Sequence, residues 1–280
     1  MGDTIDRFTT AEAHHQFSRA LSSFAVNVRA IVEKQHQGAL VYAGGDDLLA
    51  FLPLHTALDC AWELTKNFNE TIKSVIAQLQ QDMRPSPDQA LPPSPPSLSV
   101  GIVIAHHIEP LADTLQLARD TEQFAKQLPG KNALAITLSK RSGVDRRIRG
   151  RWGGDGGAFF LRIKKFVALH RVEVIPDGAA YELRNLAERL GNAPTELRDE
   201  LETAMRVNAV GIFQRKRGRR GEAKVAAHVI DDLRLALGLA PGNTEPIDVA
   251  TLADELIIAR EFARALGPDE HGVAAVPEAH

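Results

Sequence analysis

The chain has 280 residues, 44% of them apolar and 25% charged, which is enough to bury a substantial core and to form two domains. Its 33 lysines and arginines against 36 aspartates and glutamates leave a formal charge of -3, so no overall positive field draws it to nucleic acid or to an anionic membrane. Cys60 is the one cysteine and no apolar run approaches the roughly 18 residues of a membrane helix, so we expect a cytoplasmic protein without internal disulfides.

The first part of the chain alternates between helical and strand patterns. Apolar residues recur at three- and four-residue steps over residues 11–34 and predict an amphipathic helix. Two short apolar runs at residues 39–42 and 48–52 predict the strands of a hairpin, which ends at Pro53. Residues 55–79 then carry a second helical pattern.

A proline-rich segment at residues 85–96 interrupts this alternation, and we interpret it as a surface loop. Apolar and less apolar residues alternate over residues 98–104, which predicts a third strand. A helix is expected over residues 111–128, where Pro129 and Gly130 end it, and a strand over residues 133–138.

Beyond about Lys140 the strand signals fade and helical patterns dominate. We expect helices over residues 179–190, 196–207, 223–237 and 249–266. The predicted organisation is therefore an α+β domain at residues 1–143 followed by an all-helical domain at residues 144–280. Two basic clusters, at residues 140–151 and 215–220, would either contact RNA phosphates or lie in solvated loops.

The predicted hairpin tip carries Gly44, Gly45, Asp46 and Asp47. Adjacent carboxylates repel each other, and a divalent cation such as Mg2+ or Mn2+ would relieve that repulsion because hard cations take oxygen ligands. Glycines let a backbone approach a triphosphate closely. In two-metal phosphoryl transfer one ion activates the attacking hydroxyl and the other stabilises the leaving group, so this turn indicates nucleotidyl transfer.

A simpler interpretation is that these four residues only form a tight turn, since Gly and Asp are favoured in hairpins. The context favours chemistry, because the turn lies between two apolar strands with a long helix on either side, as in palm-type polymerases and cyclases.

Several blocks of sequence resemble one family of palm proteins. Residues 38–54 and 99–106 resemble the second palm domain of the large subunit of Cmr-type (III-B) type III CRISPR effector complexes, and so do Ala118-Arg119, Ala125-Lys126 and residues 130–136 in the same order. The resemblance covers residues 1–143 well and the helical remainder only in general character.

The resemblance implies a ferredoxin-like palm in a subunit that converts ATP into cyclic oligoadenylate when its complex, which contains other effector subunits and a guide RNA, binds target RNA. It implies that Asp46 and Asp47 are the catalytic, metal-binding residues and that Gly44 and Gly45 make room for nucleotide. Lys126 would meet the triphosphate, and Lys131 and Asn132 are further nucleotide-binding candidates.

The chain also departs from that pattern at its start. The family's second palm opens with a strand that carries an acidic element, followed by Met-Gly, and this chain begins at Met1-Gly2. We therefore expect the first strand and its acidic ligand to be missing, two inner sheet edges to be unpaired, and the isolated chain to be inactive and unstable.

Two other functions stay open at this point. One is a non-catalytic scaffold fragment that docks on other effector subunits through its helical domain. The other is a diguanylate cyclase, which shares the palm; its usual turn is GGDEF or GGEEF, whereas this chain has Gly-Gly-Asp-Asp-Leu, so a GTP-using cyclase is disfavoured.

Overall fold

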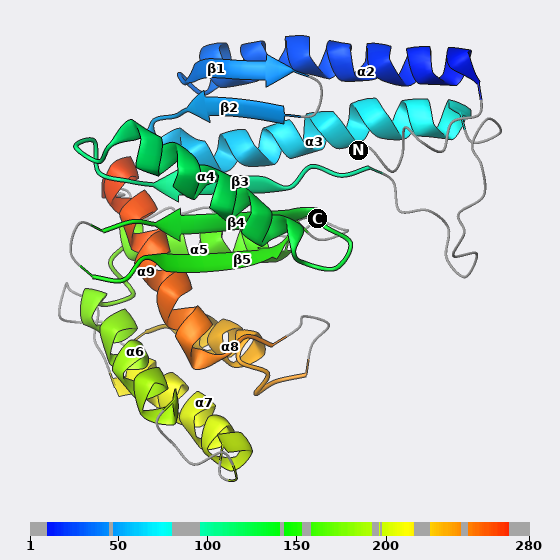
Figure 1. Ribbon diagram of the computed structural model, residues 1–280. Helices are drawn as coiled ribbons and strands as arrows, with labels where there is room; N and C mark the ends of the chain where they lie inside the picture. Colours follow the sequence, from blue (N-terminus) through cyan, green and yellow to red (C-terminus); the bar gives the residue numbers. More distant parts are fainter. Residues whose placement is uncertain are drawn as a thin grey trace. The chain divides into compact units, whose positions relative to one another are not determined.

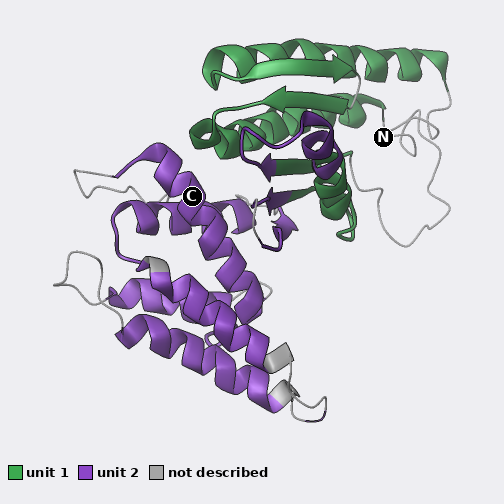
Figure 2. Cartoon of the chain, turned by 60° about the vertical axis from the view of Figure 1, so that its left-hand side comes forward, with its two compact units in different colours: residues 1–102, 118–134 green, residues 103–117, 135–280 purple. Residues whose placement is uncertain are grey.

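In the computed structural model, the described residues are 10–44, 47–79, 96–140, 143–152, 158–191, 196, 198–215, 225–241 and 246–268. The chain divides into two compact units, coloured separately in Figure 2. Unit 1 comprises residues 1–102 and 118–134, and unit 2 comprises residues 103–117 and 135–280. The proline-rich loop, the second basic cluster after Arg215, and two of the candidate site residues, Gly45 and Asp46, lie outside the described residues.

Unit 1 begins with the predicted amphipathic helix, α2 (Ala11–Arg29). Its first turn is capped by Thr10, whose hydroxyl oxygen accepts a hydrogen bond from Ala13 N at 3.1 Å. The helix continues into a π-helical segment, η1 (Ala30–Gln35), in which His36 N donates to Ile31 O at 3.1 Å. The wider π turn ends the helix directly before the first strand.

The predicted hairpin is confirmed. Strands β1 (Ala39–Gly44) and β2 (Asp47–Phe51) pair antiparallel, with Ala39 opposite Phe51 at one end and Gly44 opposite Asp47 at the other (Figure 1). The register shifts between Leu40 and Tyr42, so β1 carries a bulge a few residues before the turn. Bulges bend a strand and redirect its side chains, and they are frequent beside active sites.

Helix α3 (Leu54–Leu79) packs along α2 and closes the core of unit 1. The rings of Phe24 and Phe68 meet edge to face with centroids 5.1 Å apart. The carboxylate oxygen Oε2 of Glu63 lies 2.8 Å from Nε2 of His36. Burial, together with the negative charge of Glu63, raises the pKa of the Cys60 thiol to about 12, so this cysteine is a core residue and not a nucleophile.

A second sheet has the strand order β3-β4-β5. Its strands are β3 (Val100–Ile104), β4 (Ala133–Leu138) and β5 (Arg146–Arg151), and α4 (Leu111–Lys126) connects β3 to β4. Every residue of β4 is buried, as expected for a central strand. The boundary between the units runs through β3, α4 and β4.

Strand β5 corrects the expectation that strand structure ends near Lys140. Its sequence, RRIRGR, contains one apolar residue, Ile148, and so lacks the apolar alternation that predicts strands. Pairing to β4 makes it a strand all the same. The predicted domain boundary at residue 143 stays a prediction.

The rest of unit 2 is helical: α5 (Ala158–Arg171), α6 (Asp177–Gly191), α7 (Arg198–Arg215), α8 (Ala227–Ala236) and α9 (Val249–Leu266). Helix α9 is the most buried of these, and Asp248 caps its start by accepting a hydrogen bond from Thr251 N at 2.6 Å. Helix α5 was not expected. Its buried apolar residues occupy most sides of the helix, so no single stripe marks it in the sequence; they are Phe159, Phe160, Ile163, Phe166, Val167 and Leu169.

The chain is therefore an α+β protein with small sheets followed by a helical region, as predicted. No helix in the described ranges is both long and apolar enough to cross a membrane.

The two sheets are separate, although part of β3 shares the core of the hairpin. Val100 packs in the same hydrophobic cluster as Leu40 and Leu48, yet β2 pairs only with β1, and β3 only with β4, in the described part of the chain. The outer edges of β2 and β3 carry no lysine or arginine to block pairing with other chains.

We therefore expect the 280-residue chain on its own to self-associate through these edges. Analytical ultracentrifugation over a concentration series, combined with thermal unfolding, measures this. A soluble monomer that melts in one cooperative transition would contradict the expectation.

Candidate functional site

The end of the β1–β2 hairpin holds the first group of predicted site residues. Gly44 and Asp47 form the last pair of the ladder, and Gly45 and Asp46 between them lie outside the described residues. The Asp47 side chain is exposed and makes no hydrogen bond or ion pair with any residue that the structure describes. Its carboxylate is thus available to a ligand from solution.

Tyr42 is a site neighbour that sequence reasoning missed. A Cβ atom placed on Gly44 would lie 2.2 Å from the Tyr42 hydroxyl oxygen, so the phenol ring lies over this glycine. Tyr42 is 56% exposed, and the β1 bulge immediately precedes it. Gly44 was predicted to make room for nucleotide; here the space that its missing side chain leaves is taken by Tyr42. The signal that could have found Tyr42 is an aromatic residue two positions before the turn, on the same strand face as Gly44.

Two glycine substitutions should differ in their effect on stability, because Gly44 lies against a movable side chain and Gly101 lies against backbone. Gly44→Ala meets only the far end of an exposed side chain, so the ring moves and we expect a change under about 0.5 kcal/mol in the free energy of unfolding. Gly101→Ala places its Cβ 2.5 Å from Glu122 N in α4, where backbone must move, and we expect a loss of about 1–3 kcal/mol. Urea unfolding of the two variants checks the ranking, and equal losses would contradict it.

Lys126 lies in the last turn of α4 and is partly exposed. Its ammonium group is 2.5 Å from the Glu122 carboxylate one turn earlier. Exposed pairs at this spacing contribute only about 0.3–0.5 kcal/mol, so a phosphate could displace Glu122 at little cost. The position therefore fits the predicted role of Lys126 without establishing a contact.

Lys131 and Asn132 lie in the turn between α4 and β4. With Gly130 they form three consecutive residues at positive φ, of 78°, 54° and 50°. A lysine in the left-handed region is strained, and such strain collects at functional sites. Asn132 Oδ1 is buried and has no hydrogen-bond partner among the described residues, so it is an acceptor that the fold leaves unused.

The predicted residues thus form two groups within unit 1. No hydrogen bond or ion pair in the described ranges joins Asp47 to Lys126, Lys131 or Asn132.

The carboxylates fit magnesium only in part. No cluster of three or more His, Cys, Asp or Glu side chains that could hold a metal occurs among the described residues. Mg2+ is usually held by one or two carboxylates together with waters and substrate phosphates, and exposed Asp47 with its neighbour Asp46 matches that smaller donor set. Mn2+ accepts the same oxygen ligands.

Unit 2 contains a cavity of about 690 Å³ where α5 and α9 end. Its lining includes Arg171 and Arg264, and Arg171 Nε donates to Gly267 O at 3.0 Å. Because two helix C-termini meet there, these arginines offset negative helix ends, and the cavity contains none of the predicted site residues. We assign it no ligand.

Comparison with known proteins assigns the palm. Residues 1–135 match the family model for the second palm domain of Cas10/Cmr2. A similar protein is the CRISPR system Cmr subunit Cmr2 of Pyrococcus furiosus, which is 39% identical over 138 residues. The match covers 49% of this chain and 14% of that relative, so the chain spans a small part of the relative's length. Residues 1–135, which contain the β1–β2 hairpin and α3, are therefore a second palm domain of the Cas10/Cmr2 type, and the similarity to a Cmr subunit agrees with this assignment.

Proposed function

We propose that this chain is the part of a type III CRISPR effector large subunit that converts ATP into cyclic oligoadenylate when the complex binds target RNA. The observation that carries the proposal is the exposed, unengaged Asp47 carboxylate at the end of a palm hairpin. The palm assignment supports the effector role, and the chemistry rests on the residues of the site.

In this proposal Asp46 and Asp47 hold Mg2+ or Mn2+, which would activate the attacking ribose hydroxyl and stabilise the leaving pyrophosphate. Lys126 leaves Glu122 and pairs with the triphosphate, whose negative charge exceeds that of the carboxylate. Asn132 Oδ1 is a buried acceptor without a described partner, and in this proposal it accepts a hydrogen bond from the nucleotide. Lys131, which is exposed beside it, adds positive charge.

The partners follow from the same proposal. They are ATP, the other effector subunits, a guide RNA and a target RNA, and the place of action is the cytoplasm. We expect the chain to need the remainder of a complete subunit for activity, because two adjacent aspartates supply few of the oxygen ligands that two metal ions take.

The test uses a complete subunit that contains this sequence, assembled with its partner subunits and guide RNA. With ATP and Mg2+, we expect cyclic oligoadenylate to form when target RNA is added and not without it, as measured by mass spectrometry. Turnover of GTP in place of ATP would indicate a diguanylate cyclase. Absence of any nucleotide turnover in an assembled, RNA-bound complex would overturn the proposal.

A scaffold role is the second candidate, and exposed apolar residues on α7 favour it. Val207 is 58% exposed and Leu201 is 37% exposed on this helix. Apolar side chains on a helix surface suit docking to another subunit. Co-purification with other effector subunits that is lost in Val207→Asp, without Mg2+-dependent ATP binding by the intact complex, would favour the scaffold over the enzyme.

A further inference from the structure

Strand β5 carries four arginines in six residues, and its two faces differ in what they contact. Ile148 is 2% exposed, and a Cβ on Gly150 would lie 2.3 Å from the Phe159 ring of α5. This face of the strand therefore packs against the helices of unit 2. Because side chains alternate along a strand, Arg147, Arg149 and Arg151 lie on the opposite face.

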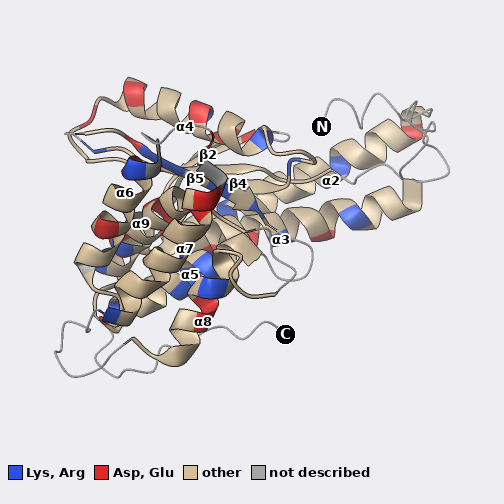
Figure 3. Ribbon diagram, turned by 90° about the horizontal axis from the view of Figure 1, so that it is seen from below, with Lys and Arg blue, Asp and Glu red and all other residues tan. Residues whose placement is uncertain are grey.

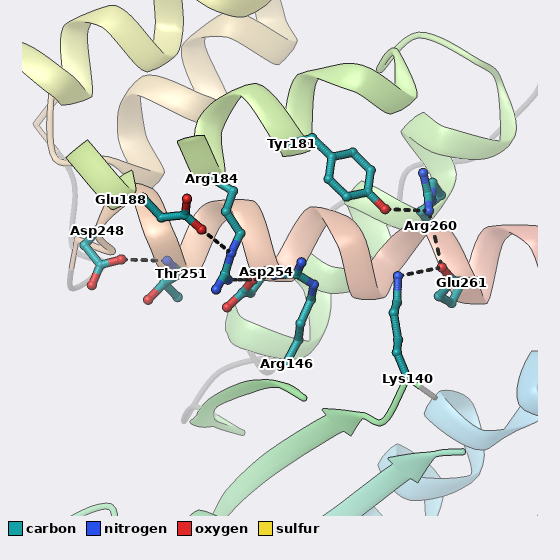
Figure 4. A network of polar contacts seen from close by, with 10 residues as sticks. All are labelled: Lys140, Arg146, Tyr181, Arg184, Glu188, Asp248, Thr251, Asp254, Arg260 and Glu261. Atoms are coloured by element: carbon teal, nitrogen blue, oxygen red, sulfur yellow. Dashed lines mark hydrogen bonds and ion pairs between the residues drawn. The ribbon is translucent and has the colours of Figure 1, made fainter. Parts of the chain in front are cut away.

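Basic residues that face the helices are neutralised by carboxylates of α9. Arg146 and Arg184 donate to the same Asp254 oxygen at 2.8 and 2.7 Å, as Figure 4 shows. Lys140 Nζ lies 3.9 Å from Glu261 Oε1, in the same view. These charges are used within the fold and are not available to another molecule.

Arg147 and Arg151 differ from that group. Both are exposed, and neither makes a hydrogen bond or ion pair with any part of the chain that the structure describes. Figure 3 shows basic residues, in blue, along β5. Two guanidinium groups on one strand face that no described carboxylate neutralises form a local positive surface in a chain whose formal charge is -3.

The position and composition of this face indicate its ligand. β5 is the outer strand of the order β3-β4-β5, so no described strand covers its outer edge. The residues of the face, Arg147, Arg149 and Arg151, include no aromatic or aliphatic anchor of the kind that protein interfaces centre on. Guanidinium groups suit phosphate oxygens, and four residues of strand separate Arg147 from Arg151 by about 13 Å, a span suited to phosphates of an extended chain.

We propose that Arg147 and Arg151 bind the phosphate backbone of a single-stranded nucleic acid that runs along this face of β5. The face offers charge and no stacking side chain, so it binds without sequence preference. A different role for the same charges is to block edge-to-edge strand pairing, which needs no ligand.

The experiment measures binding of a labelled oligouridylate to the complete subunit by fluorescence anisotropy at several salt concentrations. Each phosphate contact to a single strand contributes about 0.7 to the slope of log affinity against log salt. Arg147→Gln with Arg151→Gln is expected to reduce that slope by about 1.4, for two contacts. Arg147→Lys with Arg151→Lys keeps the charge and is expected to keep the slope.

Arg146→Gln is the matched control on the opposite face, where the arginine is already paired with Asp254; it should leave the slope unchanged. An unchanged slope in the double Gln variant would overturn the proposal, and new self-association of that variant would then indicate edge protection as the role. Displacement of the oligouridylate by tripolyphosphate at equal phosphate concentration would also overturn it, in favour of a triphosphate site. Circular dichroism confirms that each variant is folded.

Discussion

A complete subunit in which Asp46 and Asp47 are both alanine is expected to convert ATP at least about 100-fold more slowly than the unaltered subunit. The effect is large because these side chains would hold the metal that stabilises charge in the transition state, and removing one such group costs about 10²–10³-fold in rate. Asp47 is exposed and engages no described residue, so its loss should not disturb folding. The measurement is the rate of labelled ATP conversion with target RNA bound.

The matched control is Asp113→Ala. Asp113 is also an exposed aspartate, in the first turn of α4, and lies outside the candidate site. It should keep both assembly and ATP conversion. If the double hairpin variant retained synthesis while still assembling, Asp46 and Asp47 would not be the catalytic residues, and the scaffold role would gain weight.

The second large effect concerns the helical unit. Glu255 is fully buried, at 0% side-chain exposure, and Arg162 donates to its two oxygens at 2.8 and 2.7 Å. Arg162→Ala leaves a buried carboxylate without that partner, and we expect it to lower the free energy of unfolding by about 3–5 kcal/mol. Urea unfolding followed by the fluorescence of buried Trp152, in a Trp62→Phe background, reports on this unit.

The loss of unfolding free energy in Arg162→Ala should depend on pH in a defined direction. Burial raises the pKa of Glu255 above its ordinary value, and Arg162 opposes that rise, so the variant raises it further. A folded state with a raised carboxyl pKa binds protons more readily than the unfolded chain, so it gains stability as pH falls through that pKa and loses it as pH rises. The deficit of Arg162→Ala should therefore shrink as the pH falls toward the ordinary glutamate pKa near 4.3.

The double variant Arg162→Met with Glu255→Leu supplies the control, since replacing both partners with apolar residues of similar size is often close to neutral. It should be far more stable than Arg162→Ala and should show no such pH dependence. An Arg162→Ala variant as stable as the double variant at every pH would mean that the ion pair does not carry this part of the fold.

Elements with a local pattern can be predicted from the amino-acid sequence alone. The helices at α2 and α3 follow from apolar residues at helical spacing, and the hairpin follows from two apolar runs around Gly44 to Asp47. The spacing of apolar residues alone indicates which face of each element is buried, so these elements could be predicted. The candidate chemistry of Asp46 and Asp47 came from the same few residues, together with the family resemblance.

Other features depend on partners that are distant in the chain, and they become visible in the folded structure. β5 is a strand because β4 pairs with it, and α5 is a helix buried on most sides. Arg162 and Glu255 meet although 93 residues separate them. The contact of Tyr42 with Gly44 and the division of the β5 arginines into paired and unpaired faces likewise depend on how strands bend and pack. Side-chain neighbours of this kind leave no periodic signal, because they are set by the packing of elements and not by local spacing.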